Sequence, residues 1–205
     1  MSYAWHLHHV MNKVAQNDWS ADSIRSAIAR DKKEFGLDAY RLMFVTNHDE
    51  NSWNGAIAER MGVNADAMAL LAGTIFGMPL IYSGQEAGMS KRLRFFEKDT
   101  VVWGDYSKTD MYQTINALHH EEEALWNGPF GGWPQWISTP YDDEVLAWRR
   151  GKNGSEVVVA SNFSENSRLI PIGLSDLYTV VWGDVAPNQN IELPPNQTLI
   201  WRKNR

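Results

Sequence analysis

The chain has 205 residues, of which 43% are hydrophobic and 21% are charged, a composition typical of globular proteins. Its net charge of −6 argues against nucleic acid and anionic membranes as partners, because both attract basic surfaces. Cysteine is absent, which excludes disulfides and thiol chemistry, and no apolar run approaches the roughly 20 residues of a membrane span.

The first part of the chain shows helical and strand patterns in alternation. Helices are predicted over 3–15, 21–35, 56–61, 65–76 and 110–123, and strands over 41–46 and 79–82. The helix at 65–76 is apolar nearly all round, which predicts burial against something large. Strand, helix and strand form a βαβ unit, so we expect a parallel sheet covered by helices. The irregular stretch at 88–110 is long enough to suggest a functional loop.

The pattern changes near Asn127, where the Gly- and Pro-rich segment 128–134 interrupts it. Short strands then alternate with turns, at 145–150, 156–162, 168–172, 178–182 and 198–202. The sequence Gly-Lys-Asn-Gly at 151–154 is typical of a hairpin turn. We therefore predict two domains, an α/β portion at 1–126 and an all-β domain at 127–205.

Two parallel strands do not make a domain, because an open pair leaves long unpaired edges. No further strand is predicted upstream of Tyr40. Residues 1–126 are therefore expected to be part of a larger α/β domain. Open edges and uncovered apolar helix faces predict that the isolated chain is prone to aggregate.

A cluster of polar residues follows the first predicted strand. Asn47, His48, Asp49 and Glu50 stand where the apolar run ends. In α/β enzymes, the carboxyl ends of parallel strands carry the catalytic residues. On these residues alone, the simpler interpretation is an Asp that caps the next helix with a His satisfied nearby.

Three segments carry residue types that bind metals, but none is predicted to form a metal site. His6 and His9 could share a helix face, but no carboxylate one turn away completes a site. The segment 49–55 fails the EF-hand pattern, because Trp53 holds a ligand position. The His- and Glu-rich segment 119–123 lies on an amphipathic helix and is interpreted as a solvated face.

Several motifs together resemble one family. Phe44-Val45-Thr46-Asn47-His48-Asp49 resembles the strand-seven motif of the alpha-amylase family of glycoside hydrolases, and residues 77–86 are similar to its strand-eight motif. Residues 115–125 resemble its last barrel helix, and 145–164 the first hairpin of its C-terminal β domain. The resemblance extends from about Tyr40 to the end. It implies an α/β fold, a partial TIM barrel (the C-terminal part of a (β/α)₈ barrel), followed by a small all-β sandwich.

The resemblance implies roles for individual residues. Asp49 matches the third family carboxylate, the transition-state stabiliser, and His48 matches the histidine that binds the sugar. Asn47 and Glu50 are taken as further substrate-binding residues. Within the strand-eight motif, the expected role is architectural for three residues, Tyr82, Gly84 and Glu86.

The sequence departs from the family in one respect that bears on activity. The motifs that carry the nucleophile Asp on strand four and the acid/base Glu on strand five do not occur in it. The resemblance therefore implies a fragment of a longer enzyme, a retaining hydrolase of α-1,4-glucans such as starch, glycogen and maltooligosaccharides or a related transglycosylase. The fragment alone is expected to be inactive.

The expected partner is an α-glucan, with no nucleic acid and no membrane. No cofactor is expected in this chain, and calcium stays open for the full-length parent. The parent is expected to be secreted or periplasmic, although the chain shows no signal-peptide core. The alternative is a non-catalytic module that binds glucan or another subunit through exposed tryptophans such as Trp133 or Trp136.

Overall fold

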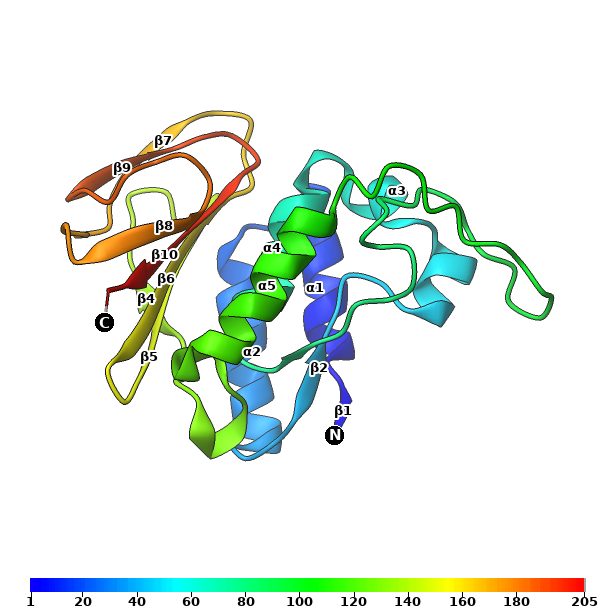
Figure 1. Cartoon of the computed structure of the whole chain (residues 1–205), viewed down its shortest axis with the longest axis horizontal. Coiled ribbons are helices and arrows are strands. Elements are labelled where there is room, and N and C mark those ends of the chain that lie inside the picture. Colours follow the sequence, from blue (N-terminus) through cyan, green and yellow to red (C-terminus); the bar gives the residue numbers. More distant parts are fainter. Residues whose placement is uncertain (205) are drawn as a thin grey trace.

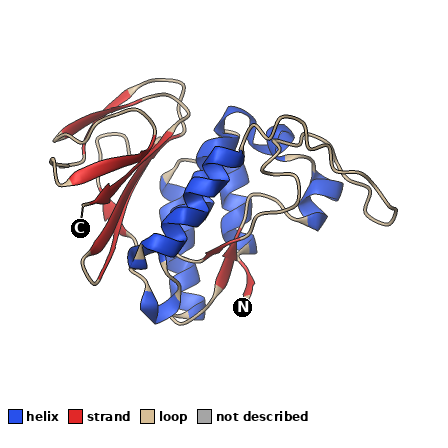
Figure 2. Cartoon of the chain, in the orientation of Figure 1, coloured by secondary structure: helices blue, strands red, loops and turns tan. Residues whose placement is uncertain are grey.

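The helices gather in one part of the molecule and most strands in another (Figure 1; Figure 2). A computed structural model describes residues 1–204. Its helices are α1 (Trp5–Ala15), α2 (Asp22–Phe35), α3 (Ile57–Met61), α4 (Ala65–Thr74) and α5 (Thr109–Glu121), with short helical turns η1 (Glu50–Asn54), η2 (Gly62–Asn64), η3 (Glu123–Leu125) and η4 (Gly128–Phe130). Its strands are β1 (Ser2–Tyr3), β2 (Arg41–Met43), β3 (Met78–Pro79), β4 (Gln135–Ile137), β5 (Val145–Lys152), β6 (Ser155–Asn162), β7 (Arg168–Pro171), β8 (Tyr178–Trp182), β9 (Asn190–Leu193) and β10 (Thr198–Lys203).

A small parallel sheet of order β1-β2-β3 organises the first part. Leu42 of β2 pairs with Tyr3 of β1 and with Met78 of β3. The prediction that no strand precedes Tyr40 is therefore wrong. Strand β1 has only two residues, too few to show the alternation by which a strand is recognised in a sequence. Strand β3 is likewise shorter than predicted.

Helix α4 lies at the centre of the core. It is buried from Ala67 to Thr74 and contacts α1, α5 and β3 as well as β6 and β10, which confirms the predicted burial. The chain beyond it passes through Gly77 with a φ of 139°. A Cβ at Gly77 would lie 2.6 Å from Cγ of Met43 and 2.8 Å from the carbonyl oxygen of Arg41. Only glycine lets the chain approach β2 so closely.

The second part of the chain consists of antiparallel strands. A sheet of order β4-β5-β6-β10-β8 and a β7-β9 pair enclose a core of their own. Alternate residues of β5 and β6 face opposite ways, because side chains alternate along a strand. One set faces this core, including Val145, Ala147, Val158 and Ala160. The other set joins the core around α4, including Leu146, Trp148, Val157 and Val159.

The predicted hairpin is confirmed, with β5 and β6 joined at Asn153 and Gly154. Both turn residues have positive φ, 50° and 87°, as a tight hairpin turn requires.

Strands β4 and β9 were not predicted, and each has no more than four residues. The division at 126/127 remains a prediction, because the core around α4 includes residues from both sides of it.

Arg150 on β5 links the two parts. Its side chain is fully buried and donates hydrogen bonds to four carbonyl groups, at 2.7 to 3.1 Å. The acceptors are the carbonyl oxygens of Thr74, Ile75, Trp126 and Gly132. Two of them lie at the C-terminal end of α4, where helix carbonyls lack partners and favour a cation. Burial lowers the pKa of Arg150 to about 9.

Two predictions of exposed side chains are wrong. Glu122 was placed on a solvated helix face, but it is buried and accepts a hydrogen bond from Ser155 at 2.6 Å, because the β5–β6 hairpin covers this end of α5. Trp133 and Trp136 were predicted to be exposed. Both are partly buried against the core, with Trp133 packed 4.7 Å from Phe76, ring to ring. No described helix is long and apolar enough to cross a membrane.

Candidate active site

The polar residues after β2 begin a helical turn. The side-chain oxygen of Asn47 accepts a hydrogen bond from the backbone N–H of Glu50 at 2.9 Å, which satisfies a donor at the start of the turn. The backbone N–H of Gly55 donates to the carbonyl of Glu50 at 3.0 Å, the wider spacing of a π-helix. Such turns are frequent at functional sites. Residues 50–54 are thus helical.

His48 and Asp49 reach solvent from this turn. Their side chains are 56% and 44% exposed, and Nε2 of His48 lies 3.6 Å from Oδ1 of Asp49. Both polar groups can therefore meet a ligand from outside. A carboxylate stabilises adjacent positive charge, and an imidazole can donate to or accept from a hydroxyl.

Glu50 has the opposite environment, although the sequence grouped it with the substrate-binding residues. Its side chain is 7% exposed, with Oε2 3.0 Å from Nε2 of His8 and 3.7 Å from Nη1 of Arg60. Its Oε1 accepts a hydrogen bond from Asn54 at 2.9 Å. The hydrogen bond with His8 is the main cause that lowers the pKa of Glu50 to about 2.

His8 and Arg60 connect Glu50 to the end of β2. The Nδ1 atom of His8 lies 3.1 Å from the carbonyl oxygen of Phe44, and Arg60 donates to the carbonyl of Val45 at 2.8 Å. Arg60 also donates to Asn12 on α1 at 2.8 Å. These residues were not predicted as part of the site. They come from distant parts of the sequence, so no local pattern could have assigned them.

The second polar strand end lies beside the first. Gly84 has a φ of 91°, and Gln85 accepts a hydrogen bond from the backbone of Tyr82 at 2.7 Å while donating to Tyr112 at 2.6 Å. These contacts fix the turn that follows β3. The carbonyl of Glu86 accepts a hydrogen bond from the backbone N–H of Lys108 at 3.1 Å, which closes the base of the long loop between β3 and α5.

Three buried polar atoms at these strand ends have no hydrogen-bond partner within residues 1–204. They are the hydroxyl of Thr46, the side-chain nitrogen of Asn47 and Oε2 of Glu86. An unsatisfied buried polar group costs about 1–3 kcal/mol, so such groups need an explanation. A ligand or further protein at this edge of the sheet would satisfy them.

No cluster of three or more His, Asp or Glu side chains suited to a metal ion occurs in the described part of the chain. His6 and His9 are both exposed on α1.

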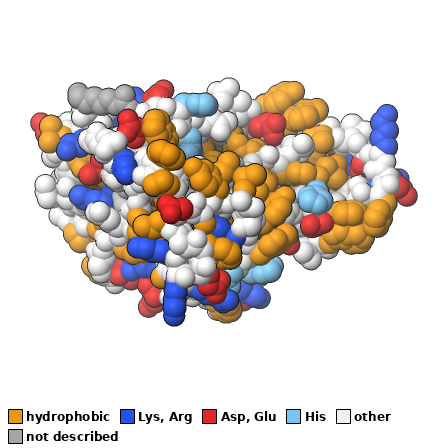
Figure 3. Space-filling view, turned by 90° about the horizontal axis from the view of Figure 1, so that it is seen from below, with side chains coloured by type: hydrophobic (Ala, Val, Ile, Leu, Met, Phe, Trp, Pro, Cys, Tyr) orange, Lys and Arg blue, Asp and Glu red, His pale blue; other side chains and the backbone are white. Residues whose placement is uncertain are grey.

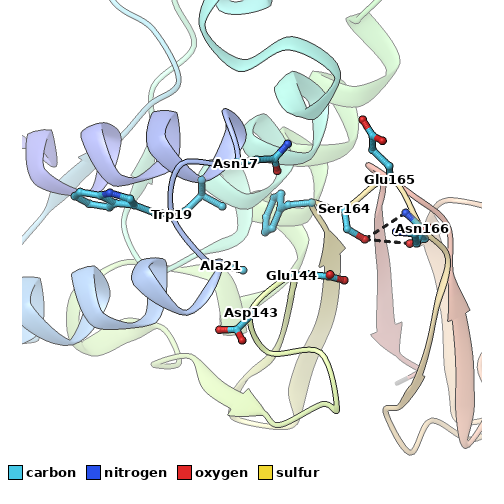
Figure 4. A pocket seen from close by; sticks show the side chains of 10 residues that line it. Asn17, Trp19, Ala21, Asp143, Glu144, Ser164, Glu165 and Asn166 are labelled. Atoms are coloured by element: carbon cyan, nitrogen blue, oxygen red, sulfur yellow. Dashed lines mark hydrogen bonds between the residues drawn. The ribbon is translucent and has the colours of Figure 1, made fainter.

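A separate hollow of about 250 Å³ lies where the α1–α2 loop meets the second part of the molecule. In Figure 4, Trp19 points away from Ser164 and Asn166. The hydroxyl of Ser164 donates a hydrogen bond to the carbonyl of Asn166 at 3.2 Å. Glu144 in the same hollow is paired with Arg168 at 2.6 Å. These polar groups are held by contacts within the chain, so the strand ends remain the candidate site.

The chain is similar in sequence to proteins that are named as amylases. No family model matches the chain. It is 27% identical over 180 residues to a beta/alpha-amylase of Paenibacillus polymyxa, which covers 83% of this chain and 14% of that protein. It is 27% identical over 152 residues to the alpha-amylase MalA of Haloarcula japonica, covering 70% and 21%.

Solved structures of alpha-amylases share the fold. A maltogenic alpha-amylase, AmyB of Thermotoga neapolitana, matches 99% of this chain and 50% of its own with a TM-score of 0.78 at 12% identity. The alpha-amylase of H. orenii matches 99% and 49%, with a TM-score of 0.71 at 18% identity. The predicted resemblance to the alpha-amylase family is thereby confirmed. The chain spans no more than half of any of these proteins.

Proposed function

We propose that this chain is part of an alpha-amylase-like enzyme that acts on α-1,4-glucans by a retaining mechanism. Residues 1–126 would supply part of a (β/α)₈ barrel, and the antiparallel strands a β-sandwich domain. The observation that carries the proposal is the placement of His48 and Asp49, which are exposed at the carboxyl end of β2 above a buried ionic network. Barrel enzymes carry their catalytic residues at this end of their strands.

In this proposal Asp49 stabilises the transition state. Glycosidic cleavage builds positive charge on the sugar ring, and the exposed carboxylate of Asp49 would lie next to that charge. His48 would bind a hydroxyl of the same sugar. The unsatisfied Asn47 nitrogen and Thr46 hydroxyl support a further polar contact at this place.

A retaining glycosidase also needs a nucleophile and an acid/base, two carboxyl groups about 5–5.5 Å apart. The motifs that carry them in the family do not occur in this sequence. The chain then provides the stabiliser and the sugar contact but cannot form or hydrolyse the covalent intermediate. Whether the complete enzyme hydrolyses or transfers depends on groups outside this chain.

Hydrolysis by the purified chain tests this division of roles. We expect no release of reducing sugar from soluble starch or maltoheptaose above the buffer rate. Hydrolysis that is abolished by Asp49→Asn would overturn the proposal, because the chain would then hold a complete site.

Binding tests the role of Asp49 directly. Maltoheptaose should shift the NMR signals of the His48 ring, and Asp49→Ala should weaken this binding roughly ten-fold through the loss of a charged hydrogen-bond acceptor. Asp38→Ala is the matched control, since Asp38 is exposed and lies before β2. Equal binding by both variants would remove Asp49 from the sugar site.

A further inference from the structure

An exposed group of aromatic rings lies next to Asp49. Trp53 is on η1, and Phe95 and Phe96 are on the long loop 83–108. The ring centroids of Trp53 and Phe95 are 5.2 Å apart, and those of Phe95 and Phe96 are 4.8 Å apart. The ring of His48 stacks on Phe95 at 6.0 Å with an interplanar angle of 27°. We call these four residues the aromatic surface.

The rings of this surface are accessible. Trp53, Phe95 and Phe96 are 57%, 39% and 84% exposed. Figure 3 shows hydrophobic side chains gathered beside a histidine at the end of the molecule that η1 and the long loop form. Contiguous exposed apolar groups of this kind mark binding sites.

Polar contacts hold the aromatic surface in place. The side chain of Asn51 on η1 donates to the carbonyl of Lys91 at 3.1 Å and accepts from the backbone N–H of Leu93 at 2.7 Å. Arg92 pairs with Glu59 at 2.8 Å. The loop is therefore tied to the same helical turn that presents Asp49.

We propose that the aromatic surface stacks a glucose unit of an α-glucan next to the unit held at Asp49. Ring faces bind the C–H faces of a pyranose by dispersion and apolar burial, while nearby polar groups take its hydroxyls. His48 belongs to both sites, because its ring stacks on Phe95 and its Nε2 faces Asp49. This continuity favours a sugar over a protein as the occupant. The inference rests on the proposed function, which places a sugar at Asp49.

Binding of maltoheptaose to the purified chain tests the stacking. The dissociation constant of the wild-type chain should be on the order of millimolar, since only part of a site is present. Trp53→Ala and Phe96→Ala should each raise it roughly two- to ten-fold, the contribution typical of one aromatic contact. Phe130→Ala is the matched control, because Phe130 is 61% exposed on a distant turn, and it should leave the constant unchanged.

The variants separate this inference from the proposed function. If Asp49→Ala weakens binding and the two ring variants do not, the aromatic surface is overturned and the role of Asp49 stands. If the ring variants weaken binding and Asp49→Ala does not, the aromatic surface stands and the proposed role of Asp49 fails. The stacking is also overturned if the wild-type chain does not bind maltoheptaose. The same holds if the ring variants change only the self-association of the chain, as measured by sedimentation.

Discussion

Asp49 and Glu50 are adjacent acids with opposite surroundings. The helical turn exposes the first, at 44% of its side chain, and buries the second, at 7%. Glu50 is paired with His8 and Arg60, so its charge is compensated inside the protein. Asp49 is not enclosed in this way, and its charge is accessible to a ligand. One residue is thus suited to chemistry and the other to holding the turn in position.

The buried pairing of Glu50 predicts a pH-dependent contribution to stability. Its folded-state pKa of about 2 lies below the ordinary 4.5, so the carboxylate stabilises the fold above about pH 4.5 and this is lost as the pH falls toward 2. Near neutral pH, Glu50→Gln should lower the Tm by roughly 10 °C. The difference in Tm from the wild type should shrink as the pH falls through this window, as measured by circular dichroism.

Glu97→Gln serves as the control, because Glu97 forms an exposed pair with Arg94. It should change the Tm little at any pH. A gap between Glu50→Gln and wild type that stays constant across the window would contradict the buried pairing.

The strand-seven motif predicted a site at His48 and Asp49, and the structure places both residues just after β2. The sequence could not show that Glu50 turns inward, because that depends on His8, which belongs to another helix. Nor could it show that Phe95 lies on His48. A loop without periodicity gives no information about where its side chains go. Predictions failed where a role depended on contacts between distant segments.

At the scale of elements, Arg150 joins the end of α4 to the segment before β4. Replacing it with Met would leave several buried carbonyls without a donor, and we expect a loss of about 3 kcal/mol in the free energy of unfolding. Arg150→Lys should recover only part of this, because one ammonium group cannot reach four carbonyls as a guanidinium does. Urea denaturation measures both changes.

Arg149→Met is the matched control on the same strand. Its side chain is 35% exposed and lies 3.7 Å from Glu156, so we expect a change below about 1 kcal/mol. A similar loss in Arg149→Met and Arg150→Met would show that the four carbonyl contacts are not what stabilises the junction.

Elements with strong local patterns were predicted well. Helix α4 is apolar nearly all round, and the β5–β6 hairpin has an Asn-Gly turn between two strands with apolar runs. Strands β1, β4 and β9 were missed, because strands of two to four residues form only where a neighbour supplies the hydrogen bonds. Glu122 was misjudged for a related reason, since a separate hairpin covers it.

At the scale of the whole molecule, one core crosses both parts. Trp148 and Ile200 from the antiparallel sheet lie in the same buried cluster as Leu70 of α4. Each part therefore completes the apolar burial of the other. The short edges at β1 and β3 stay open within the described sheet, and the predicted tendency to aggregate remains a prediction.

The shared core predicts a single unfolding transition. Trp148→Ala should lower the Tm by roughly 10 °C, as expected for a large cavity. The unfolding midpoint followed by the helical signal in far-ultraviolet circular dichroism and the midpoint followed by tryptophan fluorescence should fall by the same amount. This is expected although Trp148 lies in strand β5 and not in a helix. Trp19→Ala is the control, because Trp19 is 51% exposed. Two separate transitions would show that the parts unfold independently.

The placement of Arg150 also limits recombination between relatives. A crossover between α4 and β5 would combine α4 from one parent with β5 from another. The carbonyls at the end of α4 would then have a hydrogen-bond donor only if the new strand carries an arginine at the position of Arg150. Without an arginine there, the hybrid would fold poorly however well its surfaces matched. Shuffled genes that retain function should therefore inherit α4 and β5 from one parent, or both from parents that share this arginine.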